Sequence, residues 1–281
     1  MAMTHDELQT DATTDATTDA AAEYDSTVAA PPDPIEQQSG RRWGFWATIG
    51  FGIVVALAFV LVQTVVVVAV LLWEMVNDPD FSMEQRIEGL EADGLVLGLS
   101  TVSTTIVGVG LIVLIVRLRR GASLTEYLSL RPMSSGTVLK VLGTCAAFMA
   151  VSDGVTMMLG RPVVSAAMVE AYRTAGSLPL MWVALVVGAP VFEEMFFRGF
   201  LFEGMRRSRL GDTGAIALTA LGWTSIHLQY GSYELAVVFA GGVMLGIVRL
   251  RTGSLWAPMM FHALFNLIAT VQTALASRAS G

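Results

Sequence analysis

The sequence predicts an all-α, polytopic membrane protein with about seven transmembrane helices. The composition is 54% hydrophobic and 15% charged, and the charged residues gather between long uncharged runs. A helix of about 17–25 apolar residues crosses a bilayer, and most of these runs reach that length. The runs are residues 43–73, 94–116, 141–160 (broken by Asp153), 174–192, 213–233, 235–248 and 252–277.

Residues 1–40 differ in composition from the rest of the chain. They are rich in Thr, Ala, Asp and Pro and hold nine acidic residues. Such a segment has too little apolar surface to fold alone, so we expect a disordered acidic tail. It does not resemble a signal peptide, because it lacks a basic start and the first apolar run is too long.

The first three helices are expected in residues 44–74, 94–116 and 141–160. An acidic loop separates the first two. Asp153, in the third, is interpreted as an acid near the membrane interface rather than as a functional group. The loop at 161–178 is mixed in character and is expected to include a short interfacial helix.

The remaining four helices carry the polar chemistry. The fourth begins near Thr174 and contains an acidic pair, and the fifth, at about 213–229, carries His227. In the sixth, Gly242-x-x-x-Gly246 predicts close helix packing. The 235–248 run needs its flanks to span, so the count could differ by one.

Basic residues predict the orientation. The N-terminal flank and the alternate loops at 117–140, 206–209 and 249–251 hold twelve Lys and Arg, whereas the other side holds four. By the positive-inside rule, the N-terminus is cytoplasmic and the C-terminus lies outside. We therefore expect a multi-pass protein of the plasma (inner) membrane.

Composition also excludes some functions. The basic residues form no patch interleaved with aromatics, so nucleic-acid binding is not expected. Cys145 is the only cysteine, which excludes an intramolecular disulfide and a multi-cysteine metal site.

The acidic pair Glu193-Glu194 lies with Arg198 in an otherwise apolar segment. Ionised groups inside a bilayer cost roughly 2.5–3.5 kcal/mol each on insertion scales and are usually kept for function. Glu194 and Arg198 are four residues apart on one helix face and should pair, whereas Glu193 has no partner at that spacing. Pro190 removes one helical donor and so should free the carbonyl of Val186.

Two later helices bring further polar groups to matching depth. Counting about 1.5 Å per residue from the cytoplasmic helix ends puts Glu193, His227, His262 and Asn266 between about 13 and 21 Å deep. His262 and Asn266 share a helix face, four residues apart. A lone histidine or Glu–Arg pair has a structural explanation, but an unpaired glutamate, two histidines and an asparagine at one depth indicate function.

Three motifs resemble those of the CAAX protease and bacteriocin-processing (CPBP) family, which includes the type II CAAX prenyl endopeptidases. They are Glu193-Glu194-x-x-x-Arg198, Trp223-x-x-x-His227 and His262-x-x-x-Asn266. The resemblance covers roughly residues 180–270, and Trp223 departs from the family's more usual Phe. It implies a protease core within residues 136–281, preceded by helices and loops at 41–135.

The resemblance implies an intramembrane endopeptidase acting on a membrane-associated or lipidated peptide or protein. Glu193 and His227 would activate water, His262 and Asn266 would stabilise the oxyanion, and Glu194 and Arg198 would support the helix. No cofactor is favoured, but a zinc enzyme with Glu193, His227 and His262 as ligands is an alternative. Asn is not a usual zinc ligand, and the H-E-x-x-H motif is absent.

Two alternatives are not proteases. A proton-coupled transporter could use Glu and His as a relay, although the chain lacks the internal repeat common in transporters. A non-catalytic membrane scaffold or immunity factor is the other, and three intact motifs argue against it. The sequence does not indicate the substrate.

Overall fold

The protein is a bundle of helices, and the computed structural model describes its residues 42–279. Within that range the chain forms helices and connecting segments and no strand. The predicted all-α, multi-pass membrane fold is confirmed; the predicted tail, residues 1–40, lies outside the described residues. The elements are α2 (Phe45–Asn77), α3 (Met83–Gly89), η1 (Leu90–Ala92), α4 (Gly94–Leu118), α5 (Leu124–Tyr127), α6 (Ser135–Met158), α7 (Ala166–Arg173), α8 (Leu178–Val183), η2 (Ala184–Gly188), α9 (Ala189–Glu194), η3 (Met195–Leu201), α10 (Phe202–Arg206), α11 (Gly211–Ser225), α12 (Ser232–Thr252) and α13 (Trp256–Ala279).

Six helices in the described range are long and apolar enough to cross a membrane. They are α2, α4, α6, the continuous helix from α8 to α10, α12 and α13. The remaining predicted helix, the fifth, at about 213–229, exists as α11 but has 15 residues. At about 1.5 Å per residue it is about 22 Å long, shorter than a bilayer core. The short helix is therefore α11 and not the 235–248 run, which extends to 21 residues in α12.

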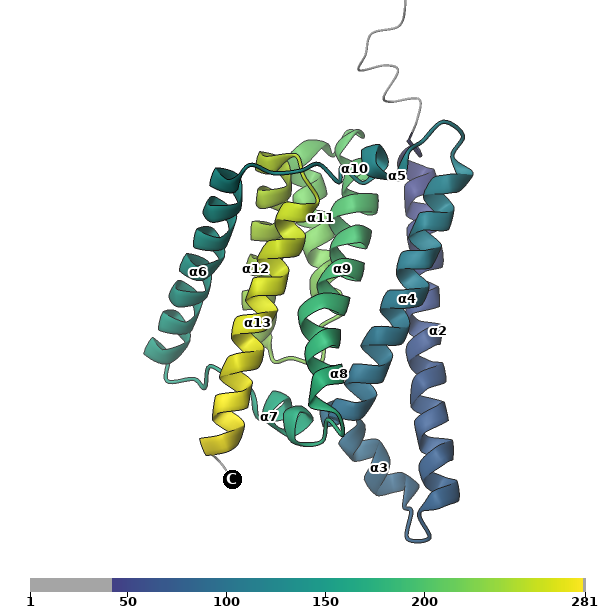
Figure 1. Ribbon diagram of the computed structural model, residues 1–281, viewed down its shortest axis with the longest axis vertical. Coiled ribbons are helices and arrows are strands. Elements are labelled where there is room, and N and C mark those ends of the chain that lie inside the picture. The colour runs from purple at the N-terminus through teal and green to yellow at the C-terminus, as the bar shows by residue number, and fades with distance from the viewer. Residues whose placement is uncertain (1–41, 280–281) are drawn as a thin grey trace, which may run out of the picture.

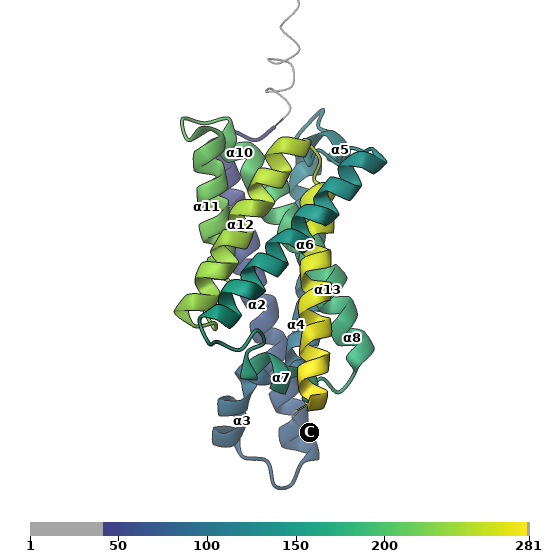
Figure 2. The same cartoon turned by 90° about the vertical axis from the view of Figure 1, so that its left-hand side faces the viewer.

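The helix from α8 to α10 lies in the middle of the bundle. It contacts α4 on one side and α13 on the other, and α2 packs along α4 (Figure 1). α11 and α12 pair with each other, and α6 crosses outside α12 and α13 (Figure 2). The central helix is consequently the most buried of the six spans, and it carries the predicted acidic pair.

Glycine allows two close helix contacts that position the central residues. A Cβ on Gly108 of α4 would lie 2.3 Å from the ring of Phe192 of α9, so any other residue would have to displace that ring. Gly242 and Gly246 of α12 lie against α11, where added Cβ atoms would meet Trp223 and Ile216 at 3.0 and 3.1 Å. The close packing predicted from Gly242-x-x-x-Gly246 is therefore confirmed.

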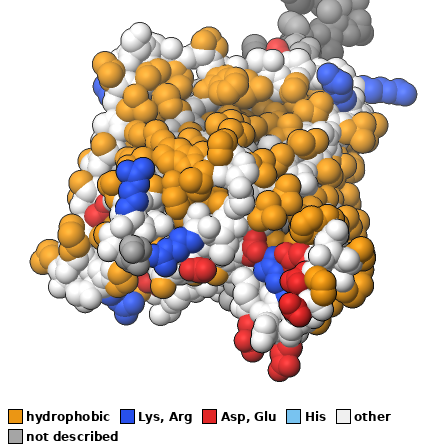
Figure 3. All heavy atoms as spheres, turned by 60° about the horizontal axis from the view of Figure 1, so that its bottom comes forward, with side chains coloured by type: hydrophobic (Ala, Val, Ile, Leu, Met, Phe, Trp, Pro, Cys, Tyr) orange, Lys and Arg blue, Asp and Glu red, His pale blue; other side chains and the backbone are white. Residues whose placement is uncertain are grey.

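The two ends of the described chain lie at opposite ends of the bundle (Figure 1). At the end that carries the C-terminus, charged side chains gather beside a broad hydrophobic area (Figure 3). There Arg86 donates two hydrogen bonds to Glu74 (2.6 and 2.9 Å) and one to Asp93 (2.5 Å). The bond to Glu74 raises the pKa of Arg86 above its ordinary value. The expected short helix in the 161–178 loop is α7, which packs against α4 and α13 near this end.

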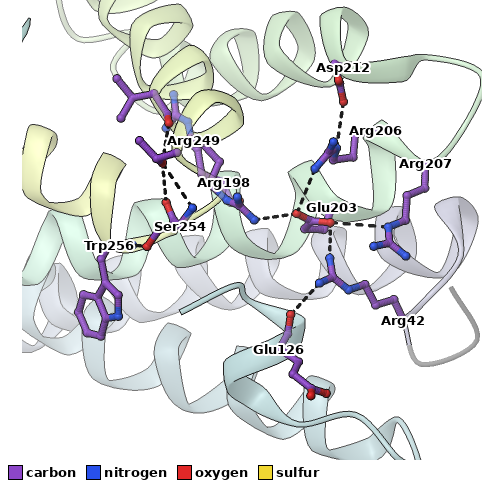
Figure 4. Close-up of polar contacts among 12 residues, drawn as sticks. Arg42, Glu126, Arg198, Glu203, Arg206, Arg207, Asp212, Arg249, Ser254 and Trp256 are labelled. Atoms are coloured by element: carbon purple, nitrogen blue, oxygen red, sulfur yellow. Dashed lines mark hydrogen bonds and ion pairs between the residues drawn. The ribbon is translucent and has the colours of Figure 1, made fainter. Parts of the chain in front are cut away.

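At the opposite end, a cluster of arginines surrounds buried Glu203 of α10 (Figure 4). Arg42 donates to one carboxylate oxygen, and Arg249 of α12 donates to the other over 2.7 Å. Arg206 and Arg207 lie 3.7 and 3.6 Å from the same carboxylate. Glu203 therefore ties α10 to α12 and to Arg42, three residues before α2.

Candidate active site

The central helix is interrupted by two π-helical segments, η2 and η3, and the acidic pair lies between them in α9. π-bulges insert an extra residue into the hydrogen-bonding register and occur frequently at functional sites. They change which side chains share a helix face. Glu193 and Glu194 are both buried there, at 9% and 0% exposure.

Glu194 is held from two directions. Arg198 donates from Nη1 to Glu194 Oε1 over 3.0 Å, so the ion pair predicted from the sequence is present and fully buried. His262 of α13 lies with Nδ1 3.0 Å from the same oxygen. Arg198 also donates from Nη2 to the carbonyl of Gly242 over 2.8 Å, which joins the central helix to α12.

Glu193 has a partner that the sequence did not predict. The indole N–H of Trp223 on α11 donates a hydrogen bond to Glu193 Oε2. Nε2 of His262 lies 4.0 Å from the same oxygen, beyond hydrogen-bonding distance. Among residues 42–279, the hydrogen bonds of this carboxylate involve Oε2 and not Oε1. Glu193 is thus oriented through one oxygen, and the other is available to a ligand.

His227 lies just past the end of α11 and beside the Trp223 ring. Its Nδ1 is 2.9 Å from the carbonyl of Trp223, and its ring packs edge-on against the indole with centroids 5.0 Å apart. Trp223 also meets His262 edge-on at 5.3 Å. The structure brings both histidines to the indole, and the hydrogen bonds and ion pairs within residues 42–279 do not join His227 to Glu193.

Asn266 lies one turn beyond His262 and donates from its side-chain amide to the carbonyl of Leu185 over 2.7 Å. This carbonyl has lost its helical donors. Because η2 is π-helical, the N–H of Ala189 donates to the carbonyl of Ala184 and not to that of Leu185. The residue five positions after Leu185 is Pro190, which has no N–H to donate. The carbonyl freed by Pro190 is therefore that of Leu185, not Val186 as the sequence predicted for an α-helix.

The partners of the two histidines determine their tautomers. A carbonyl and a carboxylate only accept hydrogen bonds, so Nδ1 carries the proton in both His227 and His262. Nε2 of each ring is then the atom that exchanges protons. Each ring nitrogen of His262 faces a carboxylate: Nδ1 lies 3.0 Å from Glu194 Oε1, and Nε2 lies 4.0 Å from Glu193 Oε2. The site therefore combines an oriented carboxylate, two imidazoles with defined exchange atoms, and an amide donor.

The residues do not form a ready metal site. No group of three His, Cys, Asp or Glu side chains within residues 42–279 is arranged to hold a metal ion. The indole of Trp223 contacts all three residues of the zinc alternative, Glu193, His227 and His262. This geometry gives the zinc alternative no support, and metal dependence stays a matter for experiment.

Sequence reasoning missed the role of Trp223 as a hydrogen-bond donor. The signal was available, because this is the position at which the second motif departs from Phe, and only an indole carries an N–H. Asp153, interpreted as an acid near the interface, accepts a hydrogen bond from Gln272 over 2.6 Å. In the part of the chain that the structure describes, no hydrogen bond or ion pair joins it to the predicted site residues.

Comparison with protein-family models matches residues 175–268 to the model described as "Type II CAAX prenyl endopeptidase Rce1-like". This segment includes all six predicted site residues and Trp223. Comparisons with curated proteins and with solved structures found no match. The family match supports a protease, and therefore a hydrolase, as the general class of activity. Residues 175–268 thus match a Rce1-like model, consistent with the CAAX protease family that the three motifs resemble.

Proposed function

We propose that the chain is an intramembrane endopeptidase that hydrolyses a peptide bond of a membrane-associated or lipidated peptide or protein. One observation carries the proposal. Buried Glu193 of α9 lies 4.0 Å from Nε2 of His262 of α13, and each group has an orienting partner of its own. Peptide hydrolysis requires such a preorganised pair of groups, one to accept a proton from water and one to stabilise the developing charge.

In this proposal Glu193 takes the proton of a water molecule as that water attacks the scissile carbonyl. The Nδ1–H of His227 donates to the Trp223 carbonyl, so this ring accepts or returns a proton through Nε2. The protonated Nε2 of His262 and the second amide hydrogen of Asn266 donate to the tetrahedral oxyanion. The proton on Glu193 then passes to the leaving amine.

Glu194 and Arg198 have a supporting role in this scheme. Glu194 accepts from Nδ1 of His262, which fixes the orientation of the ring. Arg198 compensates the charge of Glu194 and is anchored on Gly242. This arrangement resembles the carboxylate that orients the histidine in hydrolase triads.

Cleavage of a peptide library by the purified protein tests the proposal. The library should include peptides with and without a prenylated cysteine, with products identified by mass spectrometry. Wild type should cleave, Glu193→Ala should not, and Asp153→Ala is the matched control, a half-buried acid on α6 bonded to Gln272. Intact peptides with a well-folded wild type would favour the transporter or the scaffold and immunity-factor alternatives.

We also propose that the N-terminus is cytoplasmic and that the protein resides in the plasma (inner) membrane. The support is the twelve-to-four asymmetry of basic residues. Reporter fusions at Ser280 test the orientation, and a cytoplasmic signal there would contradict it.

A further inference from the structure

The environment of Trp223 is built for an indole. Its side chain is 3% exposed, and the guanidinium of Arg198 lies 5.2 Å from its ring centre. Two consecutive glycines of α12 leave room for the larger ring. Cβ atoms on Gly241 and Gly242 would lie 3.7 and 3.0 Å from its six-membered edge.

The same indole contacts three predicted site residues. It donates to Glu193 and meets His227 and His262 edge-on. A phenylalanine at this position would preserve the edge-on contacts but could not donate. Trp for Phe is therefore a chemical change at this site, not only a change of size.

We propose that Trp223 is a positioning residue, whose indole N–H fixes the Glu193 carboxylate so that Oε1 stays directed to the reacting water. The indole also keeps the carboxylate apart from His227, so that water can bridge the two. This inference rests on the proposed function for its catalytic consequence. The hydrogen bond itself can be tested without any activity.

The activity-independent test is the ¹⁵N–¹H spectrum of the tryptophan indoles in the purified, detergent-solubilised protein. The chain has six tryptophans, so the signals can be assigned by single Trp→Phe variants. A charged acceptor gives a short, strong bond. We therefore expect the signal lost in Trp223→Phe to lie downfield of the others and to move upfield in Glu193→Gln. A Trp223 signal that does not respond to Glu193→Gln overturns the proposal.

The kinetic test compares Trp223→Phe with Trp256→Phe, a half-exposed tryptophan at the start of α13 that serves as the matched control. Loss of one hydrogen bond to a charged group should lower kcat about tenfold or more, with KM within about twofold. Trp256→Phe should match wild type. The rates are normalised to folded protein by thermal melting, because a purely structural role would lower stability and not kcat per folded molecule.

The two tests separate the two failures. If wild type cleaves no peptide, the proposed function fails, and the indole spectrum still decides whether Trp223 holds Glu193. If wild type cleaves and Trp223→Phe keeps its kcat, the positioning role is overturned while the proposed function stands.

Discussion

His262 and Arg198 converge on one oxygen of Glu194. Nδ1 of His262 lies 3.0 Å from Glu194 Oε1, and Nη1 of Arg198 donates to the same atom over 3.0 Å. Two adjacent glutamates therefore have separate tasks. Glu194 joins α13 to the central helix, whereas Glu193 faces the indole of Trp223.

Replacement of Glu193 by glutamine should abolish turnover and leave the protein folded. Glutamine keeps the shape and still accepts from the Trp223 indole, but it cannot take a proton from water. Peptide cleavage and thermal melting of the same preparation measure the two effects. An active Glu193→Gln beside a folded but inactive Glu194→Gln would reverse the roles assigned to the two acids.

Replacement of Glu194 by glutamine should destabilise the protein. Arg198 is fully buried, so it would lose the one carboxylate within residues 42–279 that it pairs with, which costs roughly 3–5 kcal/mol. Arg198→Ala should destabilise to a similar degree. The double variant should lose less than the sum of the single losses, because the two residues act as a pair. Strict additivity in unfolding measurements would contradict this coupling.

Local geometry explains what the sequence could predict about this pair. Four-residue spacing placed Glu194 beside Arg198, and the structure keeps them together. The contact from His262, 68 residues away, depends on how α13 packs against α9, and no local pattern encodes it. The donation from Trp223 to Glu193 depends in the same way on α11, whose indole fits because α12 has glycines at 241 and 242.

The π-helical segments were also beyond prediction. Hydrophobic periodicity shows a helix through residues 178–206 but not whether a carbonyl bonds four or five residues ahead. The freed carbonyl therefore shifted from Val186 to Leu185. Similarly, the basic loops predicted an orientation, but their assembly around Glu203 required the helix ends to meet.

Replacement of Glu203 by glutamine should lower stability more than any other acid-to-amide change outside the candidate active site. Glu203 pairs with Arg42 and with Arg249, which is 1% exposed, and removing the counter-charge of a buried cation costs roughly 3–5 kcal/mol. Asp212→Asn is the control, because its pair with Arg206 is partly exposed and such pairs contribute about 0–1 kcal/mol. Equal melting temperatures for the two variants would contradict the role of Glu203 as a buried tie.

Activity is expected to survive strong chelators, as the ligand argument from the sequence predicts. Asn266 is a poor zinc ligand, and Glu193, His227 and His262 all contact the Trp223 indole. Elemental analysis of active protein should find zinc below one ion per chain. Loss of cleavage with chelator and its recovery on adding Zn²⁺ would establish the metalloprotease alternative instead.

Asn266 gives the sharpest separation of structure from chemistry. Asn266→Ala removes the donor to the partly buried Leu185 carbonyl. A fully buried carbonyl without a partner costs about 1–3 kcal/mol, so the loss here should lie toward the lower end of that range. If Asn266 also donates to the oxyanion, kcat should fall about 10²–10³-fold.

Pro190→Ala restores a main-chain N–H five residues after Leu185, the spacing of the π-helical segment. The double variant Pro190→Ala/Asn266→Ala should therefore regain much of the lost melting temperature while kcat stays low. Recovery of both quantities in the double variant would show that Asn266 only completes the helix, and the oxyanion role would then be withdrawn.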